Sequence, residues 1–255
     1  MLSEVLYEDK DVKWIVFARD PDKAASVIDT NEYLLISGEQ GMLLDPGGVE
    51  IFPEVVSAIS DYIPLENITT LFGSHQDPDI ISSLSLWLGT CPRARVYVPW
   101  VWSSFIPHFG CDTSQLVPVP DEGMRVEVSP THAVELVPAH YLHSSGNLHV
   151  YDPKAKILFS GDVGAALLPP DKQDLYVEDF DAHARYMDGF HRRWMPSEAA
   201  RDAWIERVSH LDIELMVPQH GAIFRRKEAK RFLDWFGGLR LASALQGSKR
   251  SDRAA

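Results

Sequence analysis

The sequence predicts an α/β protein of the α+β type, in which strands dominate the first part of the chain and helices the last part. Three observations predict this class. Short apolar runs bounded by turn residues fill the first two-thirds of the chain. Within that region, strand patterns are followed twice by helical patterns, and helical periodicity dominates after residue 175. Because no repeat, low-complexity block or linker divides the chain, we predict one domain over residues 1–246 and a disordered tail over 247–255.

The elements follow in order from apolar periodicity and turn residues. Strands are predicted at 12–18, 32–37 and 42–45, with hairpin glycines at 38 and 41, followed by a helix at 51–62. A buried strand at 68–73 precedes a helix at 79–88, and a strand at 94–99 precedes a short aromatic helix at 102–109. Residues 116–160 show only strand patterns, with a hairpin turn at 152–156. Helices at 179–195 and 197–211, a strand at 213–217 and a helix at 227–244 complete the chain.

Composition and charge exclude several functions. With 45% hydrophobic and 24% charged residues the chain can form a sizeable core, and its net charge of −13 argues against a nucleic-acid substrate. The cationic stretches 191–193 and 225–231 are interpreted as solvated helix faces. No apolar signal segment and no long apolar run is present, so we expect neither export nor a membrane span. Two cysteines, Cys91 and Cys111, fit reduced thiols in the cytoplasm and are too few for a four-cysteine metal site.

Potential metal ligands lie just beyond the ends of predicted strands. His75, Asp77 and Asp79 alternate on the loop after strand 68–73, so His75 and Asp77 can face one ion while Asp79 reaches a second. His143 and Asp162 flank a predicted hairpin, which returns both to one sheet edge. A lone loop histidine is more often a surface residue, and the aspartates could be turn caps. Three such segments in order, however, favour a binuclear site, which His220 after strand 213–217 completes.

Together these residues resemble the ligand pattern of the metallo-β-lactamase fold superfamily, which is H-x-[HED]-x-D-H, then His, then Asp, then His. The resemblance extends from LLDPGG to PQHGAIF. It implies a four-layer αββα sandwich of two mixed β-sheets with outer helices and with the metals at one edge. It also distinguishes two histidines, because the family ligand precedes the bridging aspartate by nineteen residues, as His143 precedes Asp162, whereas the rival His140 does not.

The first motif distinguishes the branches of this superfamily. Zinc hydrolases resemble H-x-H-x-D-H, whereas this sequence has Asp77 and Ile80 in place of the second and last histidines. The segments SHQDPD and PQHGAIFR are instead similar to S-H-x-E-P-D and P-S-H-G-x-I-W-R of flavodiiron and oxygen-binding di-iron proteins. Asp77 departs from their glutamate by one methylene, and a carboxylate there favours iron over zinc. By position, the resemblance implies one iron on His75, Asp77, His143 and Asp162, and another on Asp79, Asp162 and His220.

The resemblance implies a non-haem di-iron protein that binds or reduces O2, or NO, as an oxygen sensor or as the terminal half of a reductase. Such a site is of the oxidoreductase type, with no catalytic side chain beyond the metal ligands. Too few residues follow the last predicted helix to form a flavodoxin-like domain, so we expect no flavin in this chain and an external electron donor or signalling partner. A homodimer is compatible with the sequence. The alternatives are a zinc- or mixed-metal-dependent hydrolase of thioesters, esters or phosphodiesters, and a metal-free scaffold.

The helical region 175–211 is rich in aromatic residues and has two interpretations. Its apolar stripe can pack on a sheet, or one or two of its rings can cover the open face of the metal site. An apolar cover would admit a diatomic gas and exclude a bulky polar substrate. The candidates are Tyr176, Phe180, Tyr186, Phe190, His191, Trp194 and Trp204, with Trp100 and Trp102 open to the same two interpretations.

Overall fold

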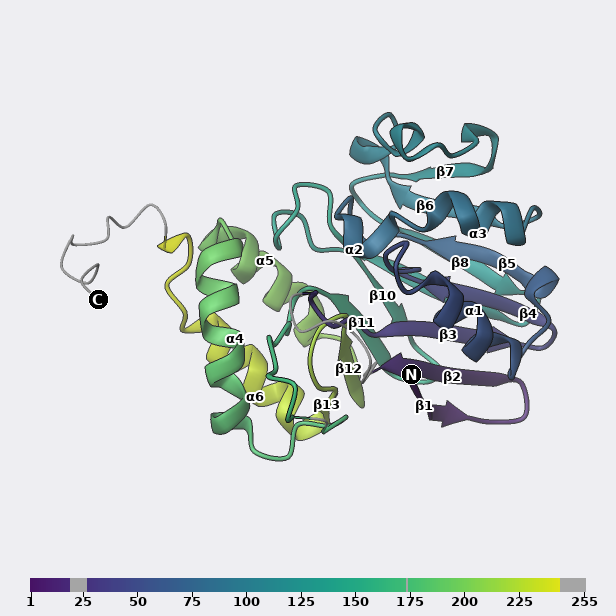
Figure 1. Ribbon diagram of the computed structural model, residues 1–255. Coiled ribbons are helices and arrows are strands. Elements are labelled where there is room, and N and C mark those ends of the chain that lie inside the picture. The colour runs from purple at the N-terminus through teal and green to yellow at the C-terminus, as the bar shows by residue number, and fades with distance from the viewer. Residues whose placement is uncertain (19–26, 173, 244–255) are drawn as a thin grey trace.

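The computed structural model describes residues 1–18, 27–172 and 174–243, which contain two β-sheets packed face to face (Figure 1). The predicted tail at 247–255 lies outside the described residues. The first sheet has seven strands in chain order: β1 (Leu2–Glu8), β2 (Val12–Ala18), β3 (Glu32–Ser37), β4 (Gln40–Leu44), β5 (Ile68–Phe72), β6 (Arg95–Pro99) and β7 (Leu116–Val119). Strands β1 to β4 are antiparallel and β4 to β7 are parallel, so the sheet is mixed.

The second sheet has six strands and is also mixed. Its spatial order is β13-β12-β11-β10-β9-β8, and β12 is parallel to β11 while the other pairs are antiparallel. The strands are β8 (Met124–Ser129), β9 (His132–Pro138), β10 (Leu148–Asp152), β11 (Ile157–Gly161), β12 (Leu215–Pro218) and β13 (Phe224–Arg225). Strands β10 and β11 are buried along their whole length, although β10 contains His149 and Asp152.

In the described part of the chain, six α-helices lie outside the two sheets (Figure 1). On the first sheet lie α1 (Phe52–Ser60), α2 (Pro78–Ile81) and α3 (Leu84–Thr90), and beside the second lie α4 (Phe180–Trp194), α5 (Glu198–Ser209) and α6 (Arg226–Gly237). Short 3-10 turns complete the chain at η1 (Leu65–Asn67), η2 (Trp100–Trp102), η3 (Ile106–Phe109) and η4 (Thr113–Gln115). Among the described residues, no helix combines the length and the apolar character needed to cross a bilayer.

Three apolar clusters separate the layers. One includes Val55 and Trp87 and lies between the first sheet and its helices, while another includes Phe190 and Phe236 and lies between the second sheet and α4 to α6. The third lies between the two sheets, where the Phe159 ring packs 5.4 Å from that of Tyr33, centroid to centroid. These layers form the four-layer αββα sandwich that the sequence predicts.

The strand directions bring several loops to one edge of the sandwich. Parallel strands β4 and β5 end at this edge, and so do β11 and β12 in the other sheet. Because β9 and β10 are antiparallel, the loop 139–147 between them lies at the same edge as the end of β11. A hydrogen bond from Leu148 N to Ser74 O, 3.1 Å long, joins the two sheets there.

Several predicted boundaries are wrong for local reasons. The helix predicted at 79–88 is two helices, because the hydroxyl of Ser83 donates to the carbonyl oxygen of Gly47, at 2.6 Å, between them. The predicted helix 102–109 is two 3-10 turns, η2 and η3, since Pro107 cannot donate a backbone hydrogen bond. The last helix ends at Gly237 rather than at residue 244, because Gly237 and Gly238 are adjacent and glycine has a low helix propensity. Strand β1 was not predicted, because most of its side chains are exposed or only half-buried.

Candidate metal centre

The loop after β5 carries the first motif. His75 follows buried Ser74 directly, and Asp77 is the residue that precedes α2. The Asp77 side chain makes no capping hydrogen bond to that helix, which leaves its carboxylate directed to other groups. Asp79 lies in the first turn of α2.

Four of the six predicted ligands form one compact group. His75, Asp77, His143 and Asp162 each offer a ligand atom, and these atoms lie within 4.8 Å of one another. His143 Nε2 is 2.9 Å from Asp162 Oδ2 and 3.4 Å from Asp77 Oδ2. His75 Nε2 is 3.5 Å from Asp162 Oδ2 and 3.6 Å from Asp77 Oδ2. We call these four residues the first ligand group.

The other two predicted ligands meet on the opposite oxygen of the same aspartate. His220 Nε2 lies 3.4 Å from Asp162 Oδ1 and 3.4 Å from Asp79 Oδ2. We call Asp79, Asp162 and His220 the second ligand group. Asp162 therefore directs one carboxylate oxygen to each group, which is the arrangement that a bridging carboxylate between two metal ions requires.

The rival histidine lies elsewhere. His140 Nε2 donates a hydrogen bond to the backbone oxygen of Asp121, at 2.8 Å. It contacts neither ligand group in any described hydrogen bond or ion pair. His143, three residues further along the same loop, is the histidine that reaches Asp162.

The charges in this centre are strongly coupled. Burial opposes ionisation of Asp162, but the imidazoles of His75, His143 and His220 outweigh it and hold the pKa of this carboxyl well below its usual range. Burial likewise opposes protonation of His220, yet Asp162 and Asp79 raise its pKa to about 10. For His75, Asp162 and Asp77 outweigh burial in the same way and hold its pKa well above the usual value. Buried carboxylates of this kind require positive charge nearby.

Two buried polar atoms show that the centre fits a cation. Among the described residues, His75 Nε2 and Asp162 Oδ1 are buried and make no hydrogen bond. Such atoms are costly unless another partner satisfies them. Three imidazole nitrogens and three carboxylates are suitable donors for iron, which accepts mixed nitrogen and oxygen ligands.

Residues that the sequence analysis did not identify orient the histidines. Ser74 Oγ donates to Asp45 Oδ2, at 2.6 Å, and lies 2.9 Å from His75 Nδ1. Because the single hydroxyl proton is used on Asp45, His75 Nδ1 donates to Ser74 Oγ, which leaves Nε2 as the ring nitrogen that faces the ligand group. His220 Nδ1 donates to the backbone oxygen of Asp29, at 2.8 Å, with the same result. The signal for Asp45 is its position after a buried strand, in the turn DPGG.

Burial also raises the pKa of the Asp45 carboxyl, to about 7, although hydrogen bonds from Ser74 oppose the change. Asp45 is completely buried and has a positive φ of 45°. This conformation turns the chain sharply after β4, so that the carboxylate faces Ser74 in the loop that follows the neighbouring parallel strand β5.

Aromatic residues of α4 cover one side of the centre. The rings of Phe190 and Trp194 lie 6.2 and 5.4 Å from the His143 ring, centroid to centroid. Trp194 is exposed, whereas Phe190 and Trp204 are buried in the cluster under the helices. Both interpretations of this region therefore apply: Trp204 packs in the cluster, Trp194 lies over the centre, and Phe190 does both. His191 is also buried rather than solvated, which corrects the interpretation of 191–193 as a solvated helix face.

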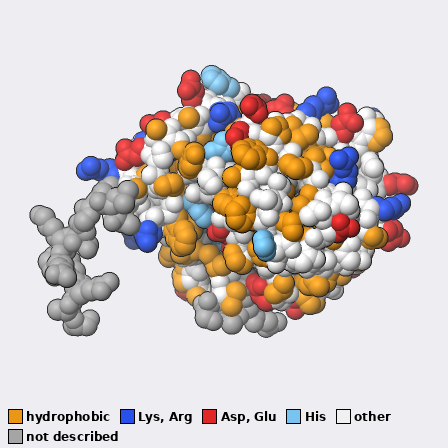
Figure 2. Space-filling model, turned by 90° about the horizontal axis from the view of Figure 1, so that it is seen from above, with side chains coloured by type: hydrophobic (Ala, Val, Ile, Leu, Met, Phe, Trp, Pro, Cys, Tyr) orange, Lys and Arg blue, Asp and Glu red, His pale blue; other side chains and the backbone are white. Residues whose placement is uncertain are grey.

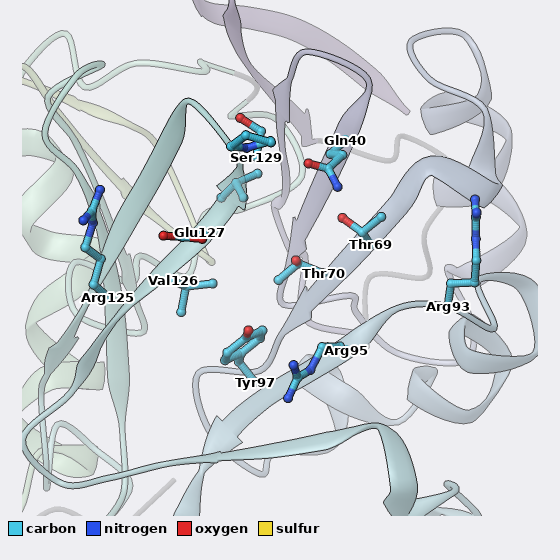
Figure 3. A pocket seen from close by; sticks show the side chains of 12 residues that line it. Gln40, Thr69, Thr70, Arg93, Arg95, Tyr97, Arg125, Val126, Glu127 and Ser129 are labelled. Atoms are coloured by element: carbon cyan, nitrogen blue, oxygen red, sulfur yellow. The ribbon is translucent and has the colours of Figure 1, made fainter.

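Hydrophobic side chains are numerous on one face of the molecule, and some histidine side chains reach the surface among them (Figure 2). A separate groove of about 630 Å³ lies between β5, β6 and β8. Figure 3 shows Arg95 and Tyr97 on one side of it and Arg125 and Glu127 on the other. None of the residues that line this groove belongs to either ligand group.

Comparisons with known proteins agree with this geometry. Residues 28–221 match the family model described as "ODP family beta lactamase". A structure of the chemotaxis sensor ODP, described as a peroxy diiron species, is 39% identical and covers 95% of this chain and 97% of its own, with a TM-score of 0.85. The apo state of the chemotaxis sensor ODP from T. denticola is 41% identical and covers 94% and 96%, also with a TM-score of 0.85.

Two other proteins are less similar to this chain in sequence. A flavo di-iron protein variant from Thermotoga maritima is 21% identical and covers 92% of this chain and 60% of that chain, with a TM-score of 0.78. An uncharacterized protein from Methanocaldococcus jannaschii is 24% identical over 205 residues, and this chain spans about half of that relative, 49%. Because the family model matches residues 28–221, which are most of this chain, the chain belongs to the ODP family of metallo-β-lactamase-fold proteins.

Proposed function

We propose that this chain is a non-haem di-iron protein that binds O2 and acts as an oxygen sensor. The observation that carries the proposal is the shared carboxylate of Asp162, whose two oxygens face two separate ligand groups. The chemotaxis sensor ODP, of which one structure is described as a peroxy diiron species, is 39–41% identical to this chain over nearly its whole length. That similarity supports iron as the metal and sensing as the function.

We assign each iron to the residues that its ligand group provides. One would be held by His75, Asp77, His143 and Asp162, and the other by Asp79, Asp162 and His220. Iron(II) ions bound there would supply electrons and open coordination positions for a diatomic molecule. A pair of such ions can provide two electrons together, whereas reduction of O2 to water takes four. Repeated turnover would therefore need an external electron donor, and a sensor needs none.

The side chains of the protein fix the geometry of this chemistry. Asp45 and Ser74 hold the His75 tautomer in which Nε2 is free, and the backbone oxygen of Asp29 does the same for His220. Phe190 and Trp194 place apolar surface beside His143. Such surface favours a small apolar gas over a bulky polar ester or phosphate, because it offers no hydrogen bonds to the latter.

The metal content of the protein tests the proposal. Protein isolated from iron-replete cells and purified without oxygen should contain two iron ions per chain. Exposure to air should produce a near-ultraviolet ferric absorption band that dithionite bleaches. Stoichiometric zinc together with cleavage of a thioester or phosphodiester would contradict the proposal and favour a hydrolase of the same fold.

We also propose a cytoplasmic location. The support for it is that Cys91 and Cys111 are both free thiols, as is usual for proteins of reducing compartments. The fold does not need either cysteine to be oxidised to a disulfide, because both side chains lie in or beside the apolar cluster under α1 and α3. Fractionation of cells that express the protein would test the location.

A further inference from the structure

Gln76, the residue between the first two predicted ligands, connects Asp77 to the loop that carries His143. Its amide Nε2 donates to Asp77 Oδ1, at 2.9 Å. Its Oε1 accepts a hydrogen bond from the hydroxyl of Ser144, at 2.7 Å. Ser144 follows His143 directly in the chain. Both ends of one side-chain amide are therefore attached to segments that carry members of the first ligand group.

The direction of every hydrogen bond in this network is determined. The indole Nε1 of Trp102 can only donate, and it lies 3.0 Å from Ser144 Oγ. Ser144 then directs its own proton to Gln76 Oε1, which can only accept. The amide nitrogen of Gln76 must accordingly face the carboxylate of Asp77. Hydrogen bonds arranged head to tail polarise one another, so each bond in the series strengthens the next.

The outer end of the network is packed tightly. Trp102 belongs to the 3-10 turn η2, which lies against the loop after His143. A Cβ atom added at Gly146 of that loop would lie 2.2 Å from Val101 Cγ1 and 3.1 Å from Trp102 Nε1. Only glycine allows this close approach. Trp102 and Ser144 are therefore held in register by backbone contact as well as by their hydrogen bond.

This network determines how the Asp77 carboxylate is presented. The amide of Gln76 occupies Oδ1, while Oδ2 faces His75 Nε2 at 3.6 Å and His143 Nε2 at 3.4 Å. A short aspartate side chain has few rotamers, so one bond on Oδ1 fixes the direction of Oδ2. Without that bond, the half-buried carboxylate could turn toward solvent.

We propose that Gln76 is a positioning residue, held by Ser144 and Trp102, that directs a single oxygen of Asp77 into the first ligand group. The inference rests on the proposed function, since it assumes that this group holds iron. The second ligand group makes no contact with Gln76 among the described hydrogen bonds, so it should not depend on this residue.

Anaerobic titration with Fe(II) against a competing chelator would test the inference in three variants. Gln76→Glu keeps the length of the side chain and an acceptor for Ser144 but replaces the donor to Asp77 by a like charge. Gln76→Met keeps the length and removes both hydrogen bonds. The matched control is Gln115→Met, because Gln115 also donates two hydrogen bonds, to Pro92 O and Ala94 O, but lies away from both ligand groups.

The wild-type protein and the control should bind two Fe(II) ions with unchanged affinity. Both Gln76 variants should bind one ion normally and the other about 10–100-fold more weakly, as is usual when a residue that orients a metal ligand is lost. His220→Ala should weaken the opposite ion, which assigns the two binding events. Trp102→Phe, which loses only the outermost donor, should weaken the same ion as the Gln76 variants by a smaller factor.

The outcomes separate the inference from the proposed function. If the wild type binds two Fe(II) ions and Gln76→Glu binds both with wild-type affinity, Gln76 does not position Asp77 and the inference is wrong. If Gln76→Glu is normal and only Gln76→Met is weak, the residue acts through the hydrogen bond that it accepts from Ser144 and not through its donor to Asp77, which also overturns the inference. If the wild type binds no Fe(II), the proposed function itself is wrong.

Discussion

Replacing Asp162 by asparagine should abolish both metal sites at once, because each of its two oxygens serves a different ligand group. Asp162 Oδ2 lies 2.9 Å from His143 Nε2, and Oδ1 lies 3.4 Å from His220 Nε2. The neutral amide keeps the size of the side chain but presents only one oxygen and no charge. Asp162→Asn should therefore retain less than one tightly bound ion where the wild type retains two.

The size of the effect on stability follows from linkage. A metal at 100 times its dissociation constant stabilises the folded state by about 2.7 kcal/mol at each site, or about 5 kcal/mol for two independent sites. For a chain of this size, 1 kcal/mol corresponds to about 2–4 °C in Tm. Saturating Fe(II) should thus raise the Tm of the wild type by about 10–20 °C and that of Asp162→Asn by only a few degrees. Anaerobic calorimetry or thermal circular dichroism measures both shifts.

Asp152→Asn is the matched control for this experiment. Asp152 is also a buried aspartate of the second sheet, but it accepts hydrogen bonds from Trp14 Nε1 at 2.7 Å and contacts His132 Nε2 at 2.9 Å, outside the metal centre. The control should lower the Tm of the metal-free protein yet keep the full metal-dependent increase. Two bound ions or the full increase in Tm in Asp162→Asn would show that Asp162 does not bridge the two ligand groups. A loss of metal in His140→Ala would show that His140, rather than His143, is the ligand.

Three further predictions concern the surroundings of the ligands. Ser74→Ala removes the group that fixes the His75 tautomer, so one of the two Fe(II) ions should bind about 10–100-fold more weakly in chelator competition; unchanged affinity would contradict this role. Trp194→Ala removes apolar cover beside His143, so azide, which is larger than O2, should bind the oxidised protein several-fold more tightly by optical titration, and an unchanged affinity would show that the ring does not restrict access. In the metal-free protein the pKa of His220 is raised to about 10. Protonated His220 therefore contributes fully to the free energy of unfolding below about pH 6.5, the ordinary pKa of histidine. This contribution is lost as the pH rises through about 10. Urea unfolding at different pH values should show the loss in the wild type and not in His220→Gln.

Much of the fold could be predicted because local patterns encode it. Strands β2 and β3 begin and end at the predicted residues, since each is an apolar run bounded by polar or turn residues. The boundaries that failed depend on contacts between distant segments. The break between α2 and α3 arises from a hydrogen bond between Ser83 and Gly47, which are 36 residues apart. No pattern within the helix itself reveals that contact.

The same distinction applies to the candidate centre. The six candidate ligands could be proposed because they follow strand ends, and His143 could be preferred to His140 because of the spacing in the family pattern. The structure brings these six side chains together. The residues that orient them could not be named. Ser144 and Gln76 are 68 residues apart, and only the packing of the two sheets brings them together. Polar residues in loops are common, so their sequence gives no sign of which ones will meet.

Burial divides the six predicted ligands in a way that bears on how a ligand reaches the centre. The side chains of His75, Asp162 and His220 are at most 4% exposed and that of His143 is 11% exposed, whereas those of Asp77 and Asp79 are 28% and 26% exposed. The buried residues extend from the ends of the sheets and close the centre from the inside. The side of α2, where the two aspartates lie, is therefore the most open side of the centre. Gln76, which is held by Ser144, fixes one of those aspartates by a hydrogen bond. On the exposed side of the centre, the position of a ligand therefore depends on side-chain hydrogen bonds rather than on the packing of the sheets.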